Sequence, residues 1–121
     1  MKLNELPILL VGSSGIIGSH LYDYLNDDYN VIPISRKNIK SQKRFLNIEL
    51  TDVKDIKRQL KMIPDSFILV FLVGLAHSKG TKKDMESFEL INCQTLINLL
   101  TILKENSKSP TKIIYSSTIS V

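Results

Sequence analysis

Apolar residues along the chain form short continuous runs separated by stretches with helical spacing. The runs at 8–11, 31–34, 45–48, 67–73 and 112–116 predict strands. The first and the fourth of these runs are apolar enough to be buried on both faces of a sheet. Because helical stretches lie between the strands, the pattern predicts an α/β fold with a parallel sheet covered by helices.

Three stretches predict amphipathic helices, each with one apolar face. Asp52 is predicted to cap the second helix, whose pattern runs up to Pro64. The third helix is expected to end near Asn106, and Ser109-Pro110 is expected to break the chain before the last strand. The predicted inward positions are Ile17, Leu21, Tyr24 and Leu25 in the first helix, Val53, Ile56, Leu60 and Ile63 in the second, and Phe88, Ile91, Thr95, Leu99, Ile102 and Leu103 in the third.

Glycines recur every third residue between the first predicted strand and the first predicted helix. Gly12 permits a sharp turn, Gly15 lets a ligand approach bare backbone, and Gly18 lets the helix pack closely against the sheet. The start of the helix offers backbone N–H groups and a partial positive charge, which suit a pyrophosphate. A strand-to-helix turn that binds nothing is the alternative interpretation. The predicted cofactor contacts in this turn are Gly12, Ser14, Gly15, Ile16, Ile17 and Gly18.

The glycines follow the pattern Gly-x-x-Gly-x-x-Gly, which ends in Gly15-Ile16-Ile17-Gly18. This pattern resembles the short-chain dehydrogenase/reductase superfamily, and it is most similar to the extended branch of NAD(P)-dependent sugar-nucleotide epimerases, dehydratases and reductases. The resemblance implies a Rossmann-type doubly wound parallel sheet with strand order 3-2-1-4-5 and a cofactor site where the order reverses. It also implies a nicotinamide dinucleotide as cofactor and a nucleotide sugar as substrate.

The end of the second predicted strand bears on which dinucleotide is bound. A family member that prefers NAD places an acidic residue there to hold the ribose hydroxyls. Here Ser35 and Arg36 stand at that place. Because arginine pairs with a phosphate through charge-assisted, bidentate bonds, NADP(H) is the predicted cofactor, with NAD(H) left open. Alternatively, Arg36 begins a solvated basic loop that continues to Arg44.

Two further strand ends resemble family positions near the cofactor. Glu49 stands at the first acidic position of the family's Asp-Leu-x-Asp pattern, which implies a contact with the adenine amino group. The backbone at Val73 and Gly74, at the end of the fourth predicted strand, would lie beside the adenosine and its ribose. His77 in the following loop could contact substrate or cofactor, although an isolated loop histidine is more often solvated.

The C-terminal part of the chain also resembles the family. The stretch 91–100 is similar to the family's Asn-Val-x-Gly-Thr-x-Asn-Leu-Leu, which implies that Asn92 is a buried amide tying helix to sheet. After the last strand, Thr118 stands where the family keeps its catalytic Ser or Thr. The family's Tyr-x-x-x-Lys pair, its last strands and its substrate domain have no counterpart in the sequence, so the fold is expected to be truncated.

Two functions of different classes follow from this partial resemblance. The first is the dinucleotide-binding portion of an enzyme that acts on a nucleotide sugar, in which Tyr is the acid/base, Lys lowers its pKa and Ser or Thr orients the reacting oxygen. Only Thr118 represents these three roles, so the chain alone is expected to be inactive. The alternative is a non-catalytic module that senses NADP(H), or a degenerate remnant.

Composition narrows the class of protein further. With 121 residues, 43% of them hydrophobic and 23% charged, the chain is expected to form one globular domain over 1–121. The net charge of +4 is not accompanied by aromatic residues among the bases, so no nucleic-acid partner is expected. No segment fits a membrane span or a secretory signal, which predicts a cytoplasmic protein. Cys93, the only cysteine, is predicted to be an inert core thiol, and no metal site is expected. An open sheet edge at the last strand would favour self-association.

Overall fold

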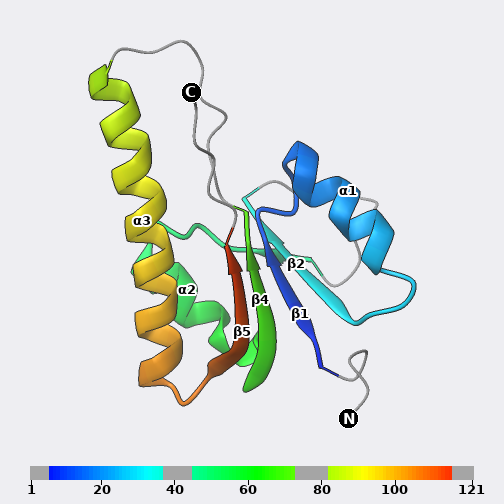
Figure 1. The fold of residues 1–121 in the computed structure, drawn as a ribbon. Coiled ribbons are helices and arrows are strands. Elements are labelled where there is room, and N and C mark those ends of the chain that lie inside the picture. Colours follow the sequence, from blue (N-terminus) through cyan, green and yellow to red (C-terminus); the bar gives the residue numbers. More distant parts are fainter. Residues whose placement is uncertain (1–5, 37–44, 73–81, 116–121) are drawn as a thin grey trace.

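The computed structural model describes residues 6–36, 45–72 and 82–115. Its centre is a five-stranded parallel sheet with the order β3-β2-β1-β4-β5, which is the predicted order (Figure 1). The elements are β1 (Ile8–Val11), α1 (Ile16–Leu25), β2 (Val31–Ser35), β3 (Leu46–Asn47), α2 (Val53–Gln59), the 3₁₀ turn η2 (Leu60–Met62), β4 (Ser66–Phe71), α3 (Lys82–Glu105) and β5 (Ser109–Tyr115).

Helices cover both faces of the sheet, as expected for a doubly wound fold. Helix α1 lies on one face, and α2 and α3 lie on the other (Figure 1). Side chains of β1 alternate between the two faces, so Leu9 packs in the core under α2 and α3, whereas Leu10 packs in the core under α1. Both side chains are fully buried, which confirms that β1 is a central strand.

The carboxyl ends of the parallel strands meet at one edge of the sheet. Val11 at the end of β1 is level with Ile34 of β2 on one side and with Phe71 of β4 on the other. The amide of Leu72 continues the ladder by donating to the Val11 carbonyl oxygen at 2.8 Å. The glycine turn that follows Val11 therefore emerges beside the end of β2.

The predicted inward face of α1 is partly wrong. Ile17 and Tyr24 are exposed, whereas Gly18 and Tyr22 are buried. Gly18 lies against the preceding turn, and Tyr22 lies one helical turn further along the same side. The close approach at Gly18 orients the helix, and Ile17 consequently faces outward.

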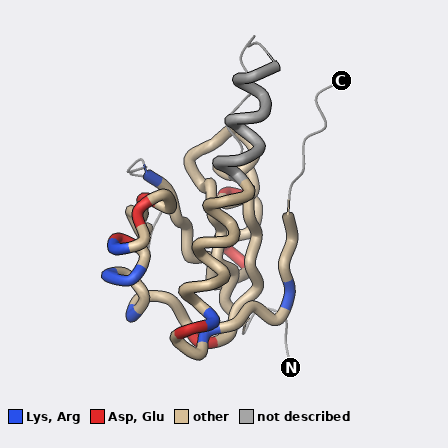
Figure 2. The backbone as a smooth tube through the Cα atoms, turned by 90° about the vertical axis from the view of Figure 1, so that its left-hand side faces the viewer, with Lys and Arg blue, Asp and Glu red and all other residues tan. Residues whose placement is uncertain are grey.

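Helix α2 begins as predicted, with Asp52 as its N-cap. The Asp52 carboxylate accepts a hydrogen bond from the amide of Lys54 at 3.0 Å. Ile56 and Ile63 are buried, but Val53 is 40% exposed. Within α2 basic residues outnumber the single acidic residue, Asp55, and the basic side chains are exposed (Figure 2). The regular helix also ends before Pro64, because η2 follows it.

The prediction for α3 is confirmed at its C-terminal half and wrong at Cys93. Thr95, Leu99, Ile102 and Leu103 are all buried. Cys93 is an exposed free thiol, because it lies two residues from Thr95 and therefore about 200° around the helix from the buried face. The side chains of Phe88, Ile91 and Asn92 lie outside the described residues.

Ser109-Pro110 does not break the chain before the last strand, because both residues belong to β5. Ser109 and Pro110 pair with the start of β4, and a register shift follows between Phe67 and Ile68. Thr111 falls at this irregularity, and its hydroxyl donates to the Phe67 carbonyl oxygen at 3.3 Å. Proline is tolerated at such a site because an edge strand does not need every N–H in the ladder.

Candidate functional site

The fold itself requires two of the three glycines in the turn after β1. Gly12 has a φ of 92°, a conformation that residues with a Cβ rarely adopt. A Cβ on Gly18 would lie 2.1 Å from the Gly12 carbonyl oxygen, which is far inside van der Waals contact. The turn can therefore keep this shape only while neither residue carries a side chain.

The fold does not require the third glycine. Gly15 has an extended backbone, with φ −73° and ψ 174°, and a Cβ there would come no closer than 3.6 Å to the Gly12 carbonyl oxygen. That distance is an ordinary contact. The bare backbone at Gly15 thus leaves open space in front of the turn, as a ligand that approaches the backbone would need.

Helix α1 begins at this open space. Gly15 is its N-cap, no side chain caps the helix, and its first turn holds no acidic residue. The first N–H groups of an α-helix have no partners within the helix, and they carry a partial positive charge. Ile16 and Ile17 are exposed, and Ser14 is half-buried. The start of α1 is therefore suited to an anion such as a pyrophosphate.

Ser13 fixes the turn to the neighbouring strand, a role that the sequence interpretation missed. Its side chain is fully buried. The carbonyl oxygen of Ile34 in β2 accepts from the Gly12 amide at 2.9 Å, from the Ser13 amide at 3.3 Å and from the Ser13 hydroxyl at 3.5 Å. Glycine spacing carries no signal for this residue, because the contact depends on how β1 and β2 pair.

The ends of β2 and β3 lie next to the turn and bring Arg36 and Glu49 together. Ser35 is buried, and Arg36 directly after it is exposed. Arg36 Nη1 lies 3.8 Å from Glu49 Oε2. The structure therefore joins the glycine turn, Arg36 and Glu49 at one edge of the sheet, from three consecutive strands.

Several predicted residues lie outside the described part of the chain. These are Val73, Gly74, His77 and Thr118, so their predicted roles stay predictions. His20 lies on α1 and is exposed. Among the described residues, no cluster of His, Cys, Asp and Glu side chains could hold a metal ion. Within the part of the chain that the structure describes, no helix is long and apolar enough to cross a membrane.

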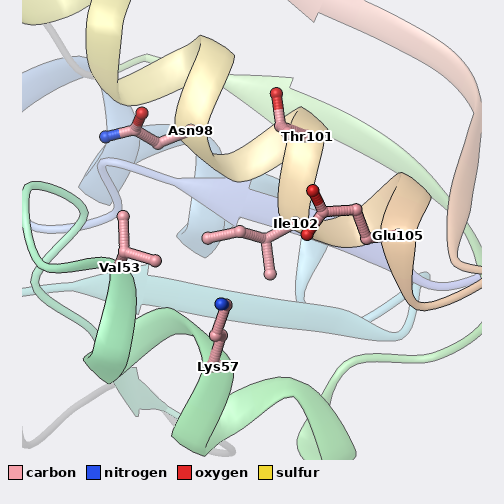
Figure 3. A pocket seen from close by; sticks show the side chains of 6 residues that line it. All are labelled: Val53, Lys57, Asn98, Thr101, Ile102 and Glu105. Atoms are coloured by element: carbon pink, nitrogen blue, oxygen red, sulfur yellow. The ribbon is translucent and has the colours of Figure 1, made fainter.

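A separate pocket of about 200 Å³ lies between α2 and α3, on the other face of the sheet from α1 (Figures 1 and 3). Figure 3 shows side chains of both helices around it, and none of them is a predicted site residue. The lining residues are Val53, Lys57, Asn98, Thr101, Ile102 and Glu105. This pocket is distinct from the glycine turn.

Comparison with known protein families decides what kind of domain carries this turn. Residues 8–121 match the NAD dependent epimerase/dehydratase family. The chain belongs to this family. An epimerase/dehydratase-family domain uses a nicotinamide dinucleotide, and the open backbone at Gly15 beside the uncapped start of α1 fits such a group. Among curated proteins, no sequence matches the chain.

Solved structures support the fold of this epimerase/dehydratase-family domain. An L-threonine dehydrogenase from Phytophthora infestans is 17% identical with a TM-score of 0.65, over 88% of this chain and 35% of that chain. The protein lin1944 from Listeria innocua is 22% identical with a TM-score of 0.58, over 86% of this chain and 51% of that chain. A short-chain dehydrogenase/reductase from Burkholderia vietnamiensis is 13% identical with a TM-score of 0.60, over 97% of this chain and 65% of that chain. The chain thus spans about a third to two thirds of these structures.

Proposed function

We propose that the chain is the dinucleotide-binding portion of an NAD(P)-dependent epimerase, dehydratase or reductase that acts on a nucleotide sugar. The observation that carries the binding role is that the fold does not need a glycine at position 15, because a Cβ would fit there. The family match and the Gly-x-x-Gly-Ile-Ile-Gly pattern support the substrate class.

In this proposal the backbone N–H groups around Ser14 to Ile17 hold the pyrophosphate. Ser35 and Arg36 face the adenosine ribose, and Glu49 lies toward the adenine. Ser35 is uncharged, so it does not repel a 2′-phosphate, and Arg36 can bind one through charge-assisted hydrogen bonds. The proposed cofactor is therefore NADP(H), ahead of NAD(H).

The dinucleotide, when bound, supplies or accepts a hydride. In the proposal the Thr118 hydroxyl orients a substrate oxygen, and the sequence contains no Tyr-x-x-x-Lys pair to move the proton. Since general acid/base catalysis commonly supplies about 10²–10⁴-fold in rate, the 121-residue chain alone is expected to bind cofactor without turnover.

Calorimetric titration of the chain with NADPH and NADH tests the binding site. Gly15→Val should reduce affinity for both by at least about tenfold, because the new side chain fills the space in front of the turn. Thr101→Val introduces the same side chain on the far side of the sheet, and it should leave affinity unchanged. Unchanged affinity in a folded Gly15→Val protein would show that the turn is not the binding site.

The choice of dinucleotide is tested with two arginine variants. Arg36→Ala should reduce NADPH affinity by about tenfold or more and leave NADH affinity nearly unchanged, since a charged hydrogen bond contributes about 1.5–3 kcal/mol. Arg58→Ala is the matched control, because the Arg58 side chain is 70% exposed, that of Arg36 is 64% exposed, and each faces one carboxylate. Equal affinity of the unmodified chain for NADH and NADPH would contradict the proposed preference.

A further inference from the structure

Arg36 already has an anionic partner within the chain. Its Nη1 atom lies 3.8 Å from Glu49 Oε2, and the two side chains are 64% and 40% exposed. A guanidinium that faces a carboxylate is partly neutralised, so any second anion must compete for it. The strength of Arg36 as a phosphate ligand consequently depends on Glu49.

The pairing of β2 with β3 creates this contact. Ser35 is level with Asn47, and the Ile48 amide donates to the Ser35 carbonyl oxygen at 3.2 Å. Arg36 directly follows Ser35, and Glu49 directly follows Ile48. Their side chains therefore leave adjacent strand ends at the carboxyl edge, where the glycine turn also lies.

Local hydrogen bonds hold both the side chain and the backbone of Glu49 in place. Glu49 Oε1 accepts from the Thr51 hydroxyl at 2.8 Å, and the Glu49 amide donates to Asp55 Oδ2 at 2.8 Å. The first bond occupies one carboxylate oxygen and leaves the other toward Arg36. The anion is thus presented to the guanidinium by the loop itself.

We propose that Glu49 is a specificity-determining residue, an internal anion that competes with the 2′-phosphate of NADP(H) for Arg36. This inference rests on the proposed function. A 2′-phosphate must displace or crowd the carboxylate, whereas the 2′-hydroxyl of NAD(H) carries no charge and leaves the pair intact. Glu49 therefore reduces the preference for NADP(H) that Arg36 creates.

The decisive measurement is the ratio of the dissociation constants for NADH and NADPH, determined by calorimetry. Glu49→Gln keeps the shape and removes the charge, and it should raise this ratio about two- to fivefold, the range expected for one exposed ion pair. The increase should shrink in high salt, because exposed charges are screened. Glu105→Gln makes the same chemical change near the end of α3 and should leave the ratio unchanged.

A double variant separates competition for Arg36 from general repulsion. If Glu49 acts through Arg36, Glu49→Gln should have almost no effect on the ratio in an Arg36→Ala background. An unchanged or lower ratio in Glu49→Gln, or an increase of the same size in the Arg36→Ala background, would overturn the inference while leaving the binding site valid. If the unmodified chain bound neither NADH nor NADPH, the proposed function would be refuted, and the inference with it.

Discussion

A Cβ atom on Gly18 would lie 2.1 Å from the carbonyl oxygen of Gly12, and 3.0 Å from the Ser13 Cα. Both contacts are with backbone, so no side-chain rotation can relieve them. Gly18→Ala must therefore push α1 away from the turn, and we expect it to lower the free energy of unfolding by about 2–4 kcal/mol. Urea denaturation followed by circular dichroism measures this loss.

Gly15→Ala is the matched control for that substitution. A Cβ at Gly15 meets its nearest neighbour at 3.6 Å. Alanine lowers the entropy of the unfolded chain but is a poorer N-cap than glycine, and these two effects roughly offset. The expected change is within about 1 kcal/mol. Equal destabilisation by the two variants would contradict the conclusion that the fold requires a glycine at position 18 but not at position 15.

The glycine pattern predicts the turn correctly but not the orientation of the helix behind it. Gly12 and Gly18 determine the turn and the orientation of α1. The hydrophobic pattern instead predicts Ile17 and Tyr24 on the buried face, and these two side chains are exposed. The buried face is decided by the one residue without a side chain, which a hydrophobic pattern cannot register. Tyr22 is buried because it shares that face.

At the candidate site, the sequence indicates which residues stand at strand ends but not how those residues pair. Asp52 can be predicted as a cap because its hydrogen bond is local, to the Lys54 amide. The contact of Arg36 with Glu49 depends on the register of β2 against β3. The role of Ser13 depends in the same way on β1 and β2. Such relationships appear only when the strands are placed side by side.

Ser107 offers a test of backbone strain at the end of α3. It has a φ of 59°, the left-handed conformation that favours glycine. The Lys108 amide donates to the Leu103 carbonyl oxygen at 2.9 Å and the Ser107 amide donates to the Lys104 oxygen at 3.2 Å, which together form a Schellman motif. Ser107→Gly should therefore raise the free energy of unfolding by about 0.5–1 kcal/mol.

Thermal and urea unfolding measure this gain, with Ser107→Ala as the control. Alanine also lacks the hydroxyl but retains the Cβ, so it should bring no stabilisation. If Ser107→Ala stabilised the chain as much as Ser107→Gly, the effect would come from the lost hydroxyl rather than from the backbone.

Lys108 joins the start of β5 to the loop before β4. Its Nζ donates to the Ile63 carbonyl oxygen and lies 3.1 Å from Asp65 Oδ1, and its side chain is largely buried. Lys108→Met keeps the aliphatic stem and removes the donor, which should cost about 1–2 kcal/mol of stability. Lys104→Met, at an exposed position in the last turn of α3, should cost only a few tenths. Equal losses in urea denaturation would argue against a specific role for the Lys108 donor.

The last prediction concerns β5, an edge strand of the described sheet. Ile113, Ile114 and Tyr115 are each about half-exposed along it. An edge with free backbone groups and apolar side chains favours pairing with another strand, so we expect the 121-residue chain to self-associate at high concentration. Sedimentation velocity over a concentration series measures this association.

Two isoleucines with the same exposure provide the variants for this test. Ile114 on β5 and Ile97 on α3 are both 49% exposed. Ile114→Lys should weaken self-association by about tenfold, because it removes the burial of half an isoleucine side chain and places like charges on the facing edges. Ile97→Lys makes the same change on a helix and should have little effect. If Ile97→Lys weakened self-association as much as Ile114→Lys, the contact between copies would involve the outer face of α3, and the prediction of pairing through β5 would be wrong.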